Sequence, residues 1–468
     1  MRLNKREWIA FFIISFIFIL VEAKGLAIVE PGDENVYYYM AKSITEGKLP
    51  YRDFFYAHPP LHIFILAAVI KIFGVNFTIL KSVNLLALLI ASFFLYKMSL
   101  ELFKNYLNDE HAYHMSILSL ILLLFSFEVM FNATFSMGVA FASMFVIASF
   151  YFIFNKKYFT GGFIGGIAGL ARFYAVVPMI AILAFFFIKK FQEKQLKDFF
   201  RMLLGFFAAF GIVIIALIIL FGSNFINPTI KYHLLKLKLP NQRITVYKNV
   251  AIENWALLLA FLLSFFIKNK KRFRIFFSVI FVYLIFLLAL NVPAEFYFSL
   301  IFPFMAIIGA YSFVALLRKI KINPIKYGLL ILMSAIFLWS AIADVLFIEK
   351  IVFSEFTLLN PLTAKLSSTN PQLKIFGDDS IVPLIGLMTN RSIALNYIDA
   401  NEMRFTSGLS NFYLFKDELD GVNLSYIIFR KNRGLHQISN FRDYTETRCS
   451  FENEYQDIVQ GTFLLYKC

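Results

Sequence analysis

Long apolar runs separated by short polar stretches make up most of residues 1–348. A helix needs about 20 such residues to cross roughly 30 Å of hydrocarbon. The pattern predicts eleven membrane spans, near residues 8–29, 79–101, 115–132, 134–154, 158–172, 174–188, 199–221, 250–267, 273–291, 296–317 and 326–348. The apolar run 61–73 is too short to span and contains Lys71, so we expect a re-entrant or juxtamembrane helix on the outer side.

Basic residues indicate on which side of the membrane each predicted loop lies. Their clusters are at residues 2–6, 97–104, 156–157, 189–201, 268–274 and 318–326. All fall on one side if the eleven spans alternate, and the positive-inside rule then places the N-terminus in the cytoplasm. The sequence therefore predicts a multi-pass protein of the cell membrane, with a transmembrane domain at 1–348 and residues 349–468 outside.

The stretch 158–188 is predicted to turn inside the membrane. Two lysine pairs, 156–157 and 189–190, flank it on the cytoplasmic side, so it must cross twice. Each half rises only about 21–23 Å at 1.5 Å per residue. We therefore expect the turn near Arg172 to lie below the outer surface, against protein or a watery cavity. Glycines at 161, 162, 165, 166 and 169 predict close approach of neighbouring helices.

The last segment has shorter apolar runs and more turn residues, which predict a small extracytoplasmic α/β domain at 349–468. The expected strands are KIFG at 374–377, SIAL at 392–395, LSYIIF at 424–429 and GTFLLY at 461–466, and SIVPLIGLM at 380–388 is an expected helix. The only two cysteines, Cys449 and Cys468, lie here. An outer domain permits a disulfide between them, with two unpaired thiols as the alternative.

Composition supports a membrane protein over a soluble one. The chain is 59% hydrophobic and 16% charged, with a mean hydropathy of +0.70 and 60 phenylalanines, whereas soluble domains are about half apolar and about a quarter charged. A net charge of +15 would suggest nucleic acid in a soluble protein. Here the basic residues follow the membrane topology and no nucleic-acid motif stands out, so we expect membrane lipids and no nucleic acid as partners.

The first outer loop, residues 30–78, contains an amphipathic helix beginning just after Asp33. Four apolar residues share one face, which predicts a helix lying on the membrane surface: Val36, Tyr39, Met40 and Ile44. Asp33 is either an N-cap, with Gly47 ending the helix, or a functional carboxylate held at a rigid helix start. These two interpretations are compatible.

The order of motifs in this loop carries a family resemblance. After the first span come Asp33-Glu34, the amphipathic helix, PYRD at 50–53, HPPL at 58–61 and the re-entrant helix. This order resembles the type-C glycosyltransferases (GT-C fold), and more narrowly the family of the protein O-mannosyltransferases and the lipid A aminoarabinose transferases. The resemblance covers roughly residues 8–320. GGFIGGIAGLARFYAVVP at 161–178 is similar to the family's glycine-rich span, and Arg172 takes its basic position.

The resemblance implies a polytopic helical fold and transfer of a hexose or pentose from a polyprenyl-phosphate carrier. The acceptor would be a protein, a glycan or a lipid at the outer face. Asp33 takes the position of the catalytic base and Glu34 completes the acidic pair, while Asp53 and His58 are candidate substrate-binding residues. We expect single displacement with inversion. No cofactor is required, although a divalent ion on Asp33 and Glu34 would suit their oxygen ligands.

One departure from the family concerns a second aspartate shortly after the third span. The corresponding stretch here, FNATFSMGVAF at 131–141, has no acidic residue. Glu128 lies just before it and is a candidate substitute, because a carboxylate at membrane depth is a functional candidate by default. The alternative is a structural group whose hydrogen bonds are satisfied.

The outer loop 222–250 departs from the positive-inside pattern. It contains six basic residues and no acidic residue: Lys231, His233, Lys236, Lys238, Arg243 and Lys248. They either contact anionic headgroups or bind the donor phosphate together with Arg172. Arginine suits the second role because its planar fork grips two phosphate oxygens. Arg172 itself has an alternative role, snorkelling to the headgroups.

Two other classes of protein share some of these features. A transporter or lipid flippase would also have many spans, a broken helix and buried charge. The chain shows no internal two-fold repeat, however, and its charged groups gather at the outer surface. A membrane scaffold displaying an outer domain would leave Asp33, Arg172 and the basic loop unexplained.

Overall fold

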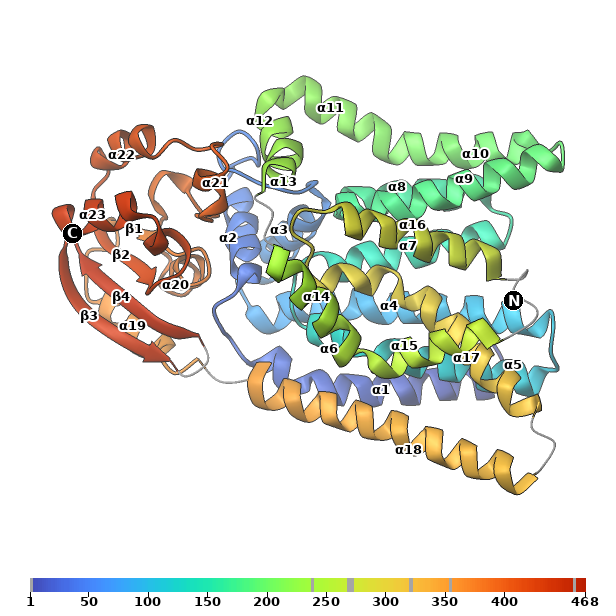
Figure 1. Ribbon diagram of the computed structural model, residues 1–468. Coiled ribbons are helices and arrows are strands. Elements are labelled where there is room, and N and C mark those ends of the chain that lie inside the picture. Colours follow the sequence, from blue (N-terminus) through green and yellow to red (C-terminus); the bar gives the residue numbers. More distant parts are fainter. Residues whose placement is uncertain (1–2, 237–239, 267–272, 320–322, 353–355, 458–459) are drawn as a thin grey trace. The chain divides into compact units, whose positions relative to one another are not determined.

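The computed structural model describes residues 3–236, 240–266, 273–319, 323–352, 356–457 and 460–468 (Figure 1). The chain divides into two compact units. Unit 1 contains residues 1–26, 81–215 and 238–352. Unit 2 contains residues 27–80, 216–237 and 353–468, so the C-terminal segment shares a unit with the first outer loop.

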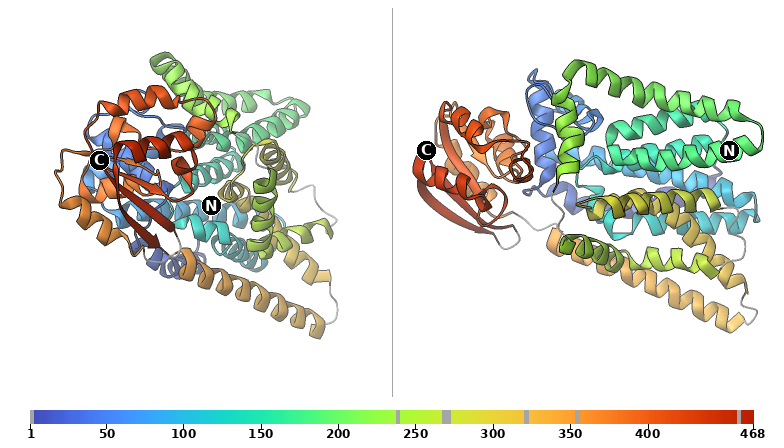
Figure 2. Two further views of the ribbon diagram at one scale, coloured as in Figure 1. Left: turned by 60° about the vertical axis from the view of Figure 1, so that its left-hand side comes forward. Right: turned by 45° about the horizontal axis from the view of Figure 1, so that its top comes forward.

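Unit 1 is helical, and its longer helices run side by side in both views (Figures 1 and 2). Its elements are α1 (Lys5–Ala27), α4 (Phe77–Lys104), α5 (Asp109–Leu124), α6 (Phe127–Ala133), α7 (Val139–Phe154), α8 (Tyr158–Ala171), η1 (Phe173–Ala175), α9 (Val176–Gln192), α10 (Leu196–Phe206), η2 (Phe207–Gly211), α11 (Ile212–Phe221), α14 (Pro240–Glu253), α15 (Trp255–Leu262), η4 (Leu263–Phe266), α16 (Arg274–Ala289), η6 (Glu295–Leu300), α17 (Phe302–Lys319), α18 (Asn323–Phe347) and η7 (Ile348–Val352). Helices α4 and α11 continue into unit 2.

Every predicted span coincides with helix, which confirms the polytopic helical class. Within the described residues, four helical segments are long and apolar enough to cross a membrane: Lys5–Ala27, Phe77–Lys104, Phe173–Gln192 and Leu196–Phe221. Two bent helix pairs raise this number to six if each is one span, and five further apolar helices are shorter. The number of eleven spans therefore stays a prediction.

Two spans expected to be continuous are broken. The span at 115–132 bends by 63° between α5 and α6, and the span at 250–267 follows an 80° bend between α14 and α15. At the first break the Ser126 hydroxyl donates to the Leu123 carbonyl (2.8 Å), and at the second the Asn254 amide donates to the Val250 carbonyl (3.2 Å). Such local side-chain bonds to the backbone compete with the helical pattern, and periodicity does not detect them.

The predicted turn inside 158–188 is confirmed. Helix α8 ends at Ala171, Arg172 is extended (φ −152°, ψ 131°), and η1 leads into α9. The predicted close glycine packing is confirmed as well. A Cβ on Gly162 would lie 1.9 Å from the Met202 carbonyl oxygen, so α8 and α10 touch backbone to backbone.

Unit 2 combines short helices with one four-stranded sheet (Figure 1). Its elements are α2 (Asp33–Thr45), α3 (Leu61–Phe73), α12 (Ser223–Ile226), η3 (Asn227–Lys231), α13 (Tyr232–Leu235), α19 (Leu359–Ser367), β1 (Lys374–Gly377), α20 (Val382–Thr389), η8 (Ala394–Asn396), α21 (Met403–Thr406), α22 (Phe412–Asp420), β2 (Leu424–Arg430), η9 (Gly434–Gln437), α23 (Ser439–Arg448), β3 (Ser450–Asp457) and β4 (Gly461–Lys467). The strand order is β1-β2-β4-β3; β1 is parallel to β2, and the other pairs are antiparallel.

Three of the four predicted strands and the predicted helix α20 are confirmed. The fourth strand, SIAL, is wrong: only Ile393 forms a single bridge, to Ile375. The next residues, Leu395 and Asn396, adopt left-handed φ angles of 53° and 54° and turn the chain into η8. Strand β3 was not predicted because it is mostly exposed and polar, without an apolar alternation.

Helix α2 differs from expectation in two ways. It begins at Asp33 with Gly32 as the N-cap residue, so the N-cap interpretation of Asp33 is wrong. Its amphipathic pattern also does not mark a broad solvent-facing side, because nine of its 13 residues are buried. Helix α3 and the C-terminal helix α20 both pack against it, a tertiary contact that local periodicity does not reveal. Gly47 (φ 90°) follows the C-cap residue Glu46, as expected at a helix end.

The two cysteines join the beginning of β3 to the end of β4. Cys449 and Cys468 form a disulfide with an S–S distance of 2.06 Å. Cys449 also belongs to the hydrophobic core of the α/β part, together with Phe415, Phe441 and Ile427. The structure therefore contains the disulfide that the sequence allowed, and not the alternative of two unpaired thiols.

Candidate functional site

The acidic pair stands at the first turn of α2. The Asp33 side chain is exposed, whereas that of Glu34 is buried. The backbone just before the pair is fixed by the C-terminal segment, since the Gly32 amide donates to the Ser380 carbonyl (3.1 Å). A helix start concentrates partial positive charge, so a carboxylate is stable there. Asp33 is thus a carboxylate held at a rigid position and open to solvent.

Within unit 2, Lys236 and Asp379 interact electrostatically with Asp33, and Asp399 interacts with both of them. Burial lowers the pKa of the Lys236 ammonium, while the carboxylates of Asp399 and Asp33 oppose this shift. Burial likewise raises the pKa of Asp399, and Arg404 and Lys236 oppose that shift. The basic loop therefore contributes Lys236 to the neighbourhood of Asp33. We call Asp33, Asp379, Asp399 and Lys236 the carboxylate–lysine cluster.

The sequence did not single out Asp379 or Asp399. Burial first, and then the carboxylates of Asp378, Asp399 and Asp33, raise the pKa of Asp379 well above its ordinary value. Asp378 is fixed differently, because its carboxylate accepts from the Ser380 amide (2.9 Å) and from Arg430 (3.4 Å). Two consecutive aspartates, Asp378 and Asp379, directly follow β1 and could have been noticed as a candidate site. Nothing local in the sequence indicates that they lie near Asp33.

The histidines of the first loop and the basic loop meet in an aromatic cluster. The rings of His58 and His233 lie 5.4 Å apart, and a ring nitrogen of His233 lies 2.9 Å from the Ala57 carbonyl oxygen. The Tyr51 hydroxyl donates to the His58 carbonyl (2.6 Å). Both histidines are half-buried, and the cluster fixes the HPPL loop against α13.

Other candidates of the loops lie elsewhere. Asp53 pairs with Arg52 (2.8 Å), and this hydrogen bond holds the pKa of the Asp53 carboxyl below its usual range. Lys231 is exposed on η3. Arg243 belongs to unit 1, where it donates to the Leu288 carbonyl. Lys238 lies outside the described residues.

In unit 1, Arg172 is buried, with 1% of its surface exposed. A buried arginine at a break between two apolar helices is a functional candidate, because burying a charge at such a place is costly. Lys81 near the start of α4 is also buried and donates to the Gly25 carbonyl (3.2 Å). Lys81 was not among the residues predicted to be functional, although a lysine inside a predicted span is an unusual feature.

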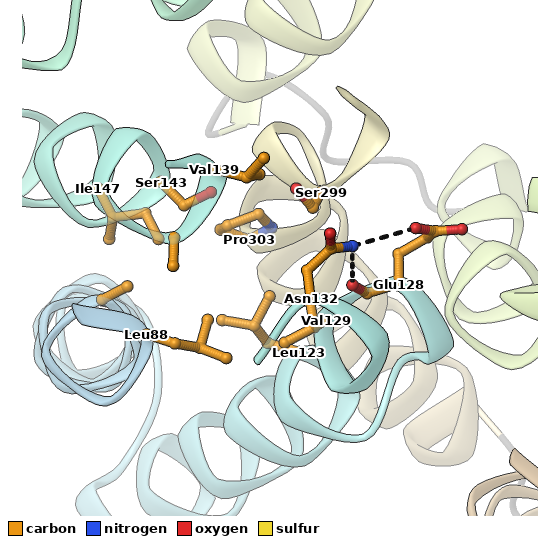
Figure 3. Close-up of a pocket in the computed structure, with 12 residues that line it drawn as sticks. Leu88, Leu123, Glu128, Val129, Asn132, Val139, Ser143, Ile147, Ser299 and Pro303 are labelled. Carbon is orange, nitrogen blue, oxygen red and sulfur yellow. Dashed lines mark hydrogen bonds between the residues drawn. The ribbon is translucent and has the colours of Figure 1, made fainter. Parts of the chain in front are cut away.

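Glu128 lies on the short helix α6 beside a cavity of about 20 Å³, room for about one water molecule (Figure 3). The Asn132 amide donates to both the backbone carbonyl (2.6 Å) and the carboxylate (3.3 Å) of Glu128. The Glu128 amide in turn donates to the Asn254 side chain (3.2 Å). This geometry favours the structural interpretation of Glu128, which joins the two bent helix pairs.

No three His, Cys, Asp or Glu side chains converge as metal ligands in the part of the chain that the structure describes. The exposed Asp33 and the buried Glu34 are the two carboxylates that the sequence offered for a divalent ion. Among the described residues, the Lys236 ammonium interacts electrostatically with Asp33.

Part of the chain matches the model of a known protein family. Residues 57–219 match the model of the family described as dolichyl-phosphate-mannose-protein mannosyltransferase. The matched stretch includes His58, Glu128 and Arg172 but begins after Asp33. None of the curated proteins matches the chain at a significant level.

The fold is similar to that of ArnT from Cupriavidus metallidurans. The crystal structure of ArnT bound to undecaprenyl phosphate matches with a TM-score of 0.68 and 10% identity, covering 99% of this chain and 98% of that chain. Its apo structure matches with a TM-score of 0.69 and 9% identity, covering 98% and 97%. These matches confirm the GT-C-like fold class expected from the sequence, and the chain is a multi-pass membrane protein.

Proposed function

We propose that the protein is an integral membrane glycosyltransferase that uses a polyprenyl-phosphate-linked sugar as its donor. It transfers the sugar to an acceptor on the outer face of the cell membrane, with its N-terminus in the cytoplasm and residues 349–468 outside. Three observations support this: the family match over 57–219, the whole-chain likeness to ArnT bound to undecaprenyl phosphate, and the exposed Asp33 beside Lys236. The last of these carries the chemical part of the proposal.

In the proposed reaction, an acceptor hydroxyl attacks the anomeric carbon of the donor sugar. The bond from that carbon to the phosphate oxygen breaks, and its electron pair leaves with the polyprenyl phosphate. The acceptor's proton passes to the Asp33 carboxylate, which acts as general base. One displacement at the anomeric carbon gives inversion of configuration.

The positive charges have separate roles in this proposal. Charge builds up on the departing phosphate, and fixed cations stabilise it most where water is excluded. Arg172, buried at the break between α8 and α9, would grip two phosphate oxygens with its planar fork. Lys236 would add positive charge near Asp33, whose carboxylate and that of Asp399 favour its charged form. Glu34, the buried second member of the acidic pair, would act together with Asp33.

A transfer assay with the purified protein tests this function. The protein is placed in nanodiscs, without any ion gradient, together with undecaprenyl-phosphate-linked hexoses and pentoses and a cell-envelope extract as acceptor. We expect release of undecaprenyl phosphate and an acceptor product whose anomeric configuration is inverted. Movement of the intact donor lipid between leaflets without release of undecaprenyl phosphate would instead identify a flippase and contradict the proposal.

A further inference from the structure

Unit 2 contains a polar groove separate from the carboxylate–lysine cluster. Its volume is about 300 Å³, and three stretches of chain line it: residues 51–55 of the first loop, residues 224–228 of α12 and η3, and residues 395–410 of the α/β part. We propose that this groove binds the carbohydrate part of the acceptor. The inference rests on the proposed function and specifies its acceptor class.

Amide and hydroxyl groups dominate the polar lining. Asn224, Asn227 and Asn396 contribute three amides. Asn227 is half-buried, and its Oδ1 atom is buried without a hydrogen-bond partner in the described part of the chain. An amide can both donate and accept, as a sugar hydroxyl does. The Asn396 oxygen already accepts from Lys48 (2.7 Å), which leaves its NH2 group as a donor. Three amides around one groove match a ligand with several adjacent hydroxyls.

Flat rings form the other kind of lining. The Arg404 guanidinium lies between the Phe55 ring (4.1 Å) and the Tyr397 ring (3.9 Å), which holds both rings in place. The Tyr397 hydroxyl also donates to Ser410 (2.9 Å). A sugar ring presents a C–H face as well as hydroxyls, and the apolar face of an aromatic ring suits the first while the amides suit the second.

Both cations of the groove are already engaged, which argues against a phosphate as the ligand. Arg52 pairs with Asp53 (2.8 Å), and Arg404 lies over two aromatic rings and donates to the Asp399 backbone carbonyl (2.7 Å). A lipid tail would need an apolar lining, and three amides oppose that. An extended peptide commonly adds to a sheet edge, but none of the lining residues belongs to a strand. The lining therefore fits a neutral ligand with several hydroxyl groups better than a phosphate, a lipid tail or a peptide.

The backbone around the groove is held in uncommon conformations. Tyr51, Leu395 and Asn396 all have positive φ angles, of 68°, 53° and 54°, and residues 227–231 form a π-helix. Such features cost free energy and gather at functional sites. Arg404 also connects the groove to the carboxylate–lysine cluster, because it contacts Asp399, whose charge acts on Lys236. An acceptor held in the groove would therefore lie next to the cluster that contains Asp33.

Direct binding, measured without a donor, tests the inference. The probes are methyl glycosides and disaccharides of mannose, glucose, galactose and N-acetylglucosamine, added to the full-length protein in nanodiscs and followed by saturation-transfer NMR. The variants are Asn224→Ala, Asn227→Ala and Asn396→Gly; glycine tolerates the left-handed conformation of position 396. Asn440→Ala, an exposed asparagine on α23, is the matched control.

We expect at least one glycoside to bind, each groove variant to weaken its binding about threefold to tenfold, and the control to bind like the wild type. We also expect each groove variant to raise the KM for the acceptor by a similar factor and to leave the KM for the donor unchanged. This result would show that the groove binds the acceptor during transfer. Absence of binding at millimolar glycoside, or equal binding by the groove variants, would overturn the inference. A preference for unglycosylated acceptor peptides over glycosides would overturn it as well.

The outcomes separate this inference from the proposed function. Donor-dependent transfer by a protein whose groove variants keep the wild-type KM for the acceptor would refute the groove and leave the transferase intact. Glycoside binding that is sensitive to the groove variants, without transfer from any polyprenyl-phosphate sugar, would support the groove as a carbohydrate site and refute the transferase.

Discussion

The Tyr39 hydroxyl donates a hydrogen bond of 2.8 Å to the backbone carbonyl of Arg391, which lies 352 residues further along the chain. It also accepts one of 3.1 Å from the Ile393 amide. Burial raises the pKa of Tyr39 to about 12, so the hydroxyl stays protonated as the donor that Arg391 requires. Because Tyr39 and Asp33 share helix α2, this bond makes the position of Asp33 depend on the C-terminal segment.

Replacement of Tyr39 by Phe removes both hydrogen bonds and leaves a carbonyl and an amide buried without their partner. We expect the free energy of unfolding to fall by about 1–3 kcal/mol. Thermal unfolding in detergent measures the change. Tyr413→Phe serves as the control, because Tyr413 is 67% exposed on α22 and should lose nothing. Equal stability of the two variants would mean that the bond does not hold α2 in place.

Helix packing in unit 1 is tested at Gly162. A Cβ there would lie 1.9 Å from the Met202 carbonyl oxygen, and backbone atoms have little freedom to move away. We expect Gly162→Ala to destabilise the protein by at least about 1–3 kcal/mol, even though alanine favours helix. Gly328→Ala on α18 is the control, since no atom lies within 4 Å of its added Cβ. A destabilised Gly328→Ala and a stable Gly162→Ala would contradict the backbone contact between α8 and α10.

Acid should weaken the α/β part through His436. Burial lowers the pKa of the His436 imidazole, and its Nδ1 accepts from the Asn432 amide (3.1 Å), which requires the neutral ring. The unfolded chain therefore binds a proton more readily than the folded one. The stabilising contribution is present above the unfolded pKa, about 6.5, and is lost as the pH falls below it.

We therefore expect the melting temperature of the wild type to fall more between pH 7.5 and pH 5.5 than that of His436→Gln. His114→Gln, at a position 55% exposed on α5, should keep the wild-type pH profile. Identical profiles of the wild type and His436→Gln would exclude this histidine as the source of acid sensitivity.

Arg172 is expected to bind the donor phosphate. A lysine keeps the charge but replaces a bidentate fork with a point charge, so Arg172→Lys should weaken the apparent donor affinity about threefold to tenfold. Arg172→Ala should weaken it about tenfold to a hundredfold. Titration with an undecaprenyl-phosphate sugar measures both, with Arg201→Lys, 57% exposed on α10, as the control. An unchanged affinity of the lysine variant would favour an arginine that snorkels to the headgroups.

The sequence predicted best what local pattern encodes. Apolar runs located the helices, and the lysine pairs and the length of 158–188 predicted the turn at Arg172. The glycines predicted a close helix neighbour, which the structure identifies as α10. The breaks at Ser126 and Asn254 were missed because they lie inside continuous apolar runs, and the local side-chain bonds to the backbone found there leave no periodic signal. Strand β3 was missed because a polar edge strand has no apolar alternation.

The candidate site was predictable only in part. Asp33 and Lys236 stood out through a motif and a local excess of positive charge. Their neighbours Asp379 and Asp399 come from the other end of the chain and meet them only through tertiary contacts, of which Tyr39 with Arg391 is one. For the same reason, the burial of α2 by α20 could not be read from the amphipathic pattern of α2 alone.

The most direct measurement of the central claim is the rate of sugar transfer by Asp33→Asn. Asparagine keeps the size of the side chain but cannot accept the acceptor's proton, so we expect a loss of about 100-fold to 10,000-fold, with donor binding and the melting temperature unchanged. Asp443→Asn on α23, 69% exposed, is the control and should transfer like the wild type. Transfer by purified Asp33→Asn at the wild-type rate would contradict the account, because Asp33 would then not be the base.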